Sequence, residues 1–173
     1  MAGIIGLLTT ITCAPLDVIS ISETSTSTIP KATLLEQLIG DLGFGSFINL
    51  SIADNTELKN QGVEQHQIDS VHATSLTLTI LEPASDQDFS FLESIAFYVE
   101  ASGLDKVRIA YGENFEAGAR TIELTTDNVD IAPYAAADSM TITTDVDGRR
   151  PDNETLIEAG IILQVDLNVG GIL

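Results

Sequence analysis

The stretch TLIEAGIILQVDLNV, residues 155–169, decides the fold. Its apolar side chains recur at every second position, namely Ile157, Ala159, Ile161, Leu163, Val165, Leu167 and Val169. Most of the intervening positions are polar, and Ile162 is the exception. Because successive side chains of a strand point to opposite faces, this period of two predicts a long β-strand with one buried face and one solvated face.

The same alternation recurs along the chain. It is seen in the segments Val71–Leu81, Ser90–Glu100, Lys106–Tyr111, Arg120–Thr126 and Ser139–Val146. Turn-forming residues separate these segments, so about eight or nine strands follow one another at hairpin spacing. No strand–helix alternation typical of a parallel α/β sheet is present. The pattern therefore predicts an all-β protein, an antiparallel β-sandwich that is either Ig-like or jelly-roll-like.

Three segments complete the strand assignment. Ser20–Ile29 is either a strand with the polar edge Glu23–Thr28 or a flexible Ser/Thr linker. Phe47–Ile52 alternates and predicts a further strand, whereas residues 54–67 are polar and predict a loop. Within Lys106–Tyr111, alternation places Tyr111 on the same face as Val107 and Ile109.

One segment carries a helix signal. Thr33 and Glu36 have the spacing of a capping box. An apolar stripe with spacings of one, three and four follows, formed by Leu34, Leu35, Leu38, Ile39 and Leu42. Glycines from Gly40 onward would end it. We therefore expect one short helix near residues 33–42, plugging one end of the sheet.

Composition excludes several classes of protein. The 173 residues contain 7 Lys plus Arg and 26 Asp plus Glu, so the net charge is 7 − 26 = −19. Such a field repels nucleic acid and anionic membrane surfaces. Apolar residues make up 44% of the chain, which argues against disorder. No apolar run reaches the length of a transmembrane helix. We expect no nucleic-acid partner and no transmembrane helix.

The N-terminal segment differs from the rest of the chain. Residues 1–13, MAGIIGLLTTITC, carry no charged side chain and end in Cys13, the only cysteine, so no intrachain disulfide is possible. The segment is interpreted as an export signal or anchor, or as a terminal strand. Residues 14–173 are then expected to form a single β-sandwich domain.

Candidate chemistry is sparse. Asp145, Asp147 and Asp152 form the densest group of oxygen ligands and are the candidate calcium site; apart from calcium there, no cofactor is expected. The competing interpretation is a charged hairpin turn over residues 147–154, with Asp147 and Gly148 as turn residues. His66 and His72 do not have the ligand grouping of a zinc site, and no nucleophile motif is present. We therefore expect a protein that is not an enzyme.

Carbohydrate binding has limited compositional support. β-Sandwiches that bind sugars usually present exposed aromatic platforms, and this chain has no Trp. Its tyrosines are Tyr98, Tyr111 and Tyr134. The sequence alone therefore singles out no aromatic platform and no ligand.

The N-terminal segment also resembles a known family. Thr10-Ile11-Thr12-Cys13-Ala14 is similar to the lipobox of bacterial lipoproteins, and the segment from Phe89 to Val169 looks like the β-rich body of uncharacterised exported bacterial proteins. The resemblance implies cleavage before Cys13, acylation of its thiol and an extracytoplasmic location. Membrane contact would then be made only through a lipid anchor at Cys13.

Two functions remain open at this point. The first is a non-enzymatic exported cell-envelope or cell-surface protein that acts as a binding or interaction module. The alternative is a structural protein that assembles into an oligomer or fibre through its apolar terminal strands, residues 1–13 and 169–173. Both functions imply a protein partner or self-association.

Overall fold

The computed structural model describes residues 18–33, 37–47, 50–52, 54–137 and 139–168, and they build nine strands. The strands are β1 (Val18–Ile29), β2 (Gln37–Gly40), β3 (Ile68–Glu82), β4 (Leu92–Ala101), β5 (Val107–Glu113), β6 (Thr121–Glu123), β7 (Thr125–Thr126), β8 (Met140–Arg149) and β9 (Thr155–Leu167). The helical segments are short: η1 (Gly45–Phe47), α1 (Thr56–Asn60), η2 (Gln65–Gln67), η3 (Phe89–Phe91) and α2 (Ala132–Ala135).

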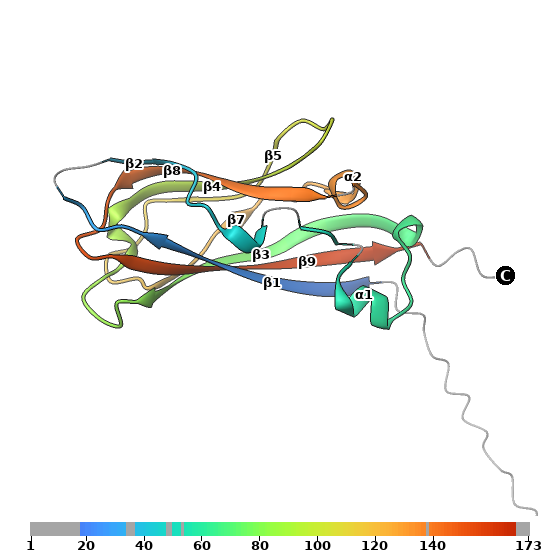
Figure 1. The fold of residues 1–173 in the computed structure, drawn as a ribbon, viewed down its shortest axis with the longest axis horizontal. Coiled ribbons are helices and arrows are strands. Elements are labelled where there is room, and N and C mark those ends of the chain that lie inside the picture. Colours follow the sequence, from blue (N-terminus) through green and yellow to red (C-terminus); the bar gives the residue numbers. More distant parts are fainter. Residues whose placement is uncertain (1–17, 34–36, 48–49, 53, 138, 169–173) are drawn as a thin grey trace, which may run out of the picture.

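The strands form two antiparallel sheets that pack face to face (Figure 1). One sheet has the order β1-β9-β3-β6, and the other has the order β2-β8-β4-β5-β7. The prediction of an all-β antiparallel sandwich is confirmed. Strands from the beginning and the end of the chain lie side by side in both sheets, as β1 with β9 and β2 with β8. This is the order of a jelly roll rather than that of an Ig domain.

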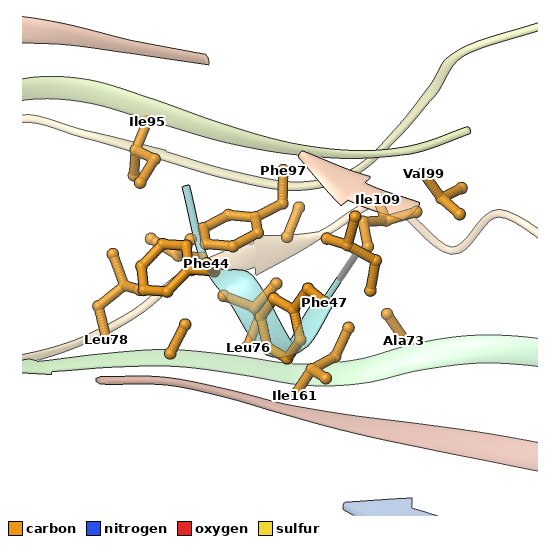
Figure 2. Packing of buried hydrophobic residues seen from close by; sticks show 14 of the residues in the cluster. Phe44, Phe47, Ala73, Leu76, Leu78, Ile95, Phe97, Val99, Ile109 and Ile161 are labelled. Carbon is orange, nitrogen blue, oxygen red and sulfur yellow. The ribbon is translucent and has the colours of Figure 1, made fainter. Parts of the chain in front are cut away.

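The core lies between the two sheets and is filled by the inward positions of each strand. Figure 2 shows Leu76 and Ile161 of the four-stranded sheet facing Phe97 and its neighbours on the other sheet. Phe47 of η1 and Phe44, the residue before η1, place their rings between the two sheets. The rings of Phe44 and Phe97 have centroids 5.8 Å apart. Alternation therefore works as expected, with each strand contributing one face to a shared aliphatic and aromatic core.

The predicted helix near residues 33–42 is wrong. Gln37–Gly40 form strand β2, which pairs with β8, while residues 34–36 lie outside the described residues. Leu38 is buried and Ile39 is 68% exposed, so the two follow the period of a strand. Gly40 has φ +104°, which no helix tolerates. Pairing with β8 outweighs the local helical spacing, because tertiary contacts override intrinsic propensity.

Other boundaries also differ from the expectations. Val18–Ile29 is a strand and not a linker, with Ser25 and Ser27 buried on its inner face. The strand expected at Phe47–Ile52 is reduced in the described residues to a bridge between Leu50 and Met140. Part of the loop expected at 54–67 forms the one-turn helix α1.

The connection from β8 to β9 begins later than expected. Asp147 and Gly148 belong to β8 and not to a turn. A Cβ atom on Gly148 would lie 2.4 Å from the carbonyl oxygen of Phe91, so only glycine allows β4 to approach β8 this closely.

The N-terminal segment, residues 1–13 with Cys13, lies outside the described residues, as do residues 14–17 and 169–173. Among the described helices, none has the length and apolar character needed to cross a membrane.

Candidate functional site

A β-bulge in β5 shapes the outer face of the five-stranded sheet. Phe97 pairs with Ala110, whereas the next residue, Tyr98, pairs with Arg108, so Ile109 is an extra residue in β5. Ile109 and Ala110 are both buried, and the residues on either side of them therefore point outward. The expectation that Tyr111 shares the face of Ile109 is wrong. The bulge moves Tyr111 to the outer face, beside Arg108.

The outer face is hollowed into a groove of about 430 Å³. We call it the tyrosine groove and define it by the residues Ile39, Ser94, Ala96, Tyr98, Arg108, Tyr111, Glu113, Asp145 and Asp147. The hollow arises because β4, in the middle, presents the short side chains of Ser94 and Ala96. Larger side chains rise from the neighbouring strands β8 and β5.

Strand register fixes the two walls of the groove. Ala96 pairs with Asp145 on one side and with Tyr111 on the other, and Ser94 pairs with Asp147 and Glu113 in the same way. The β8 wall and the β5 wall are two strand spacings apart, or about 10 Å. The width is thus set by backbone hydrogen bonding and does not depend on loop conformation.

Each tyrosine of the groove carries a cation over its ring. Lys106 Nζ lies 4.7 Å from the ring centroid of Tyr98, and Arg108 Cζ lies 4.3 Å from that of Tyr111. Arg108 is held in turn by Asp127, with Nε 2.6 Å from Oδ2 and Nη2 3.3 Å from Oδ1. The hydrogen bond to Asp127 raises the pKa of the Arg108 guanidinium. The two tyrosine rings are therefore held in place by contacts within the protein itself.

The opposite wall presents carboxylates. Asp145 and Asp147 are exposed on β8, and neither has a hydrogen-bond or ion-pair partner within the described part of the chain. Asp145 and Asp147 are two positions apart on β8 and therefore lie on the same face, so their carboxylate oxygens point into the same hollow. The groove thus combines carboxylate acceptors on the β8 wall with Arg108 and Tyr111 on the β5 wall, and Tyr98 stands on β4 between the two walls.

A second hollow, also of about 430 Å³, lies at the end of the sandwich where β8 turns into β9. Three of the seven basic residues line it, namely Arg120, Arg149 and Arg150, together with Asp86, Asp88 and Asp152. Arg120 donates hydrogen bonds to the carbonyl oxygens of Ile80, Pro83 and Gln87, which ties down the β3–β4 connection.

Asp88 ties together two of the connections around this end hollow. It accepts hydrogen bonds from the backbone N–H groups of Ser90 at 3.0 Å and Gly118 at 2.6 Å. Hydrogen bonds from Ser90 and Gly118 lower the pKa of its carboxyl group. The end hollow is thus built from groups that hold connections in place.

The predicted calcium ligands are not brought together. Asp145 and Asp147 line the tyrosine groove, whereas Asp152 lines the end hollow. Within the described residues, no group of three or more His, Cys, Asp or Glu side chains is placed to hold a metal ion. The three aspartates are close in sequence. However, Asp145 and Asp147 lie within β8, which ends at Arg149, whereas Asp152 lies in the connection to β9.

The two histidines occupy separate structural positions. His66 lies in η2, with Nδ1 3.2 Å from an oxygen of Glu64, and His72 lies on β3, with Nδ1 3.1 Å from the carbonyl oxygen of Val129. The contact of His66 is local, whereas that of His72 joins β3 to the segment before α2. They do not point to a shared metal or catalytic role.

Sequence reasoning missed the tyrosine groove because it depends on pairing between distant segments. The sequence does not indicate that Tyr98 and Tyr111 lie on the same face. The bulge that turns Tyr111 outward has no sequence signature in this chain. Comparison with known proteins adds no assignment, since no protein-family model and no curated protein matches the chain.

Proposed function

We propose that the protein is a non-enzymatic exported cell-envelope protein, a binding module whose ligand surface is the tyrosine groove. The groove itself is the observation that supports this proposal. Binding sites are concave and combine apolar side chains with a few placed polar groups. Here Ile39, 68% exposed at the rim, and the two tyrosines supply the apolar surface, while Asp145 and Asp147 supply acceptors that have no partner among the described residues.

Occupancy of the groove is tested by oxidative labelling of tyrosines in intact producing cells and in the purified protein. Tyr98, Tyr111 and Tyr134 are all partly buried, and Tyr134, in α2 and outside the groove, is the internal control. A bound ligand protects Tyr98 and Tyr111 in cells but leaves Tyr134 unchanged. Equal labelling of all three tyrosines in both samples would contradict a groove ligand.

Export is supported by the lipobox-like segment ending at Cys13 and is tested by the mass of the protein isolated from its producing cells. Loss of residues 1–12 with added acyl mass on Cys13 is the expected result. An intact chain beginning at Met1 would remove the lipid anchor from the proposal. Two acyl chains or more are needed for stable membrane attachment, so the number of chains is informative.

Self-association is a second candidate, favoured by the edge strand β1. This strand is 12 residues long, and its only charged residue is Glu23. Long edge strands without Lys or Pro pair readily with other chains. Ser22 of the edge strand β1 and Ser75 of the inner strand β3 both pair with Ile162 of β9, one from each side. Analytical ultracentrifugation should show that Ser22→Lys, at the edge, dissociates an oligomer that Ser75→Lys preserves; a monomeric wild type refutes this candidate.

A further inference from the structure

The size of the tyrosine groove limits what it can hold. Its hollow of about 430 Å³ lies in the range of small-ligand sites. A stable protein–protein interface uses about 20–30 residues a side, far more than the residues that define this groove. A short segment of a ligand therefore fits the groove better than the face of a folded partner.

The length of the groove indicates an extended ligand. Lining residues run along β4 from Ser94 to Tyr98, a distance of four residue steps, which corresponds to about 13 Å. The hollow follows β4 over the short side chains of Ser94 and Ala96, and Tyr98 stands at its end. A chain of linked units could therefore lie along β4 with its two sides facing β8 and β5.

The chemistry of the walls selects the ligand class. Asp145 and Asp147 are acceptors without partners in the described residues, so they suit a ligand with several hydroxyl donors. The same carboxylates, with Glu113 on the other side, repel a ligand that carries acidic groups. The rings of Tyr98 and Tyr111 and the side chain of Ile39 offer surface to C–H groups.

Tyr98 and Tyr111 are also ordered before a ligand binds, so binding costs little conformational entropy at these side chains. The ring of Tyr98 lies under Lys106, and the ring of Tyr111 lies under Arg108, which Asp127 fixes. Side chains that are already ordered lose less conformational entropy when a ligand binds. Lys106 Nζ and the N–H groups of Arg108 that Asp127 does not engage can also donate hydrogen bonds to neutral oxygen atoms of the ligand.

From these features we propose that the tyrosine groove binds a neutral oligosaccharide. Its hydroxyl groups donate hydrogen bonds to Asp145 and Asp147, and its C–H faces pack against Tyr98 and Tyr111. This inference rests on the proposed function as a binding module and names its ligand class. A basic peptide is the main competing occupant, since it would also be attracted to the carboxylates.

The test uses an array of neutral glycans with hexose, N-acetylhexosamine and pentose backbones, followed by isothermal titration of the best binder. Oligogalacturonate is the acidic comparison and oligolysine is the peptide comparison. A neutral glycan should bind, and oligogalacturonate should bind about tenfold more weakly or less because of repulsion from the carboxylates. No binding to any neutral glycan, or tighter binding of oligolysine, would overturn the inference.

Two variants locate the binding. Tyr98→Ala removes one aromatic surface, and Asp147→Asn removes one charge at an exposed position where folding is not at risk. Each should weaken glycan binding about tenfold or more. Asp69→Asn is the matched control, because Asp69 is exposed on β3 in the other sheet. Equal affinity of all variants would place the glycan outside the groove and refute the inference.

Failure of this inference is distinguishable from failure of the proposed function. Protection of Tyr98 and Tyr111 in cells without glycan affinity would keep the binding module and exclude neutral sugars as its ligand. Absence of protection would refute a groove ligand in the cell, whatever purified glycans do.

Discussion

Neighbouring isoleucines in β9 provide a sharp test of the sandwich, because Ile161 and Ile162 differ only in the face they occupy. Ile161 is 0% exposed in the core between the sheets, and Ile162 is 40% exposed on the outer face. Replacing either by Ala removes the same Cγ1, Cγ2 and Cδ1 carbons and changes strand propensity by the same amount. Any difference in stability therefore reports burial.

The expected magnitudes follow from that burial. At about 0.8 kcal/mol per carbon, Ile161→Ala loses about 2.4 kcal/mol of transfer free energy, and the enclosed cavity brings the total to about 2–5 kcal/mol. Ile162 is buried over the remaining 60% of its surface, and water refills the space it leaves. Ile162→Ala should therefore cost about 1 kcal/mol.

The assay is urea and thermal unfolding followed by far-UV circular dichroism. At about 2–4 °C per kcal/mol for a chain of this size, Ile161→Ala should lower the Tm by about 4–20 °C, and Ile162→Ala by about 2–4 °C. Equal losses for the two variants, or a larger loss for Ile162→Ala, would refute the register of β9 and with it the orientation of the whole four-stranded sheet.

Three further results are expected. Burial alone would raise the pKa of Asp41, but hydrogen bonds from Gly43 and Thr144 lower it below 3.8, so Asp41→Asn should cost about 0.5–1 kcal/mol in chemical denaturation at pH 7. That cost should start to decrease as the pH falls below 3.8 and be lost once the pH is below the lowered pKa of folded Asp41, because the carboxyl group is then protonated in both states; a cost that persists in acid would contradict the hydrogen bonding. Gly148→Ala should cost about 1–3 kcal/mol in the same assay, since its Cβ meets a backbone oxygen, whereas the control Gly45→Ala meets nothing within 4 Å and should cost under about 0.5 kcal/mol. Millimolar calcium should leave the Tm unchanged, because the predicted ligands line different hollows; a rise in Tm would show a site that binds the folded state.

The long strands were predictable from the sequence because their alternation is local. β9 begins at Thr155 as expected, and β3 contains the whole of Val71–Leu81. In each case one face is uniformly apolar, so the hydrophobic pattern alone fixes which side is buried. The class of fold follows from several such strands in succession.

Features that depend on pairing between distant segments were not predictable. Gln37–Gly40 has helical spacing and becomes a strand only because β8 lies beside it. The choice of a jelly roll over an Ig-like sandwich rests on β1 pairing with β9, from opposite ends of the chain. The two walls of the tyrosine groove likewise come from segments that meet only across β4.

The bulge in β5 makes the tyrosine groove depend on chain length as well as on side chains. Side-chain direction alternates strictly along a regular strand, so deleting Ala110 would leave Ile109 inward and Tyr111 still outward, whereas one residue inserted after Ala110 would send Tyr111 toward the core. Such an insertion would take Tyr111 out of the β5 wall while leaving every residue that lines the groove in the sequence. The groove can therefore be lost through a single-codon insertion, whereas deletion of Ala110 is expected to keep both the sandwich and the outward Tyr111.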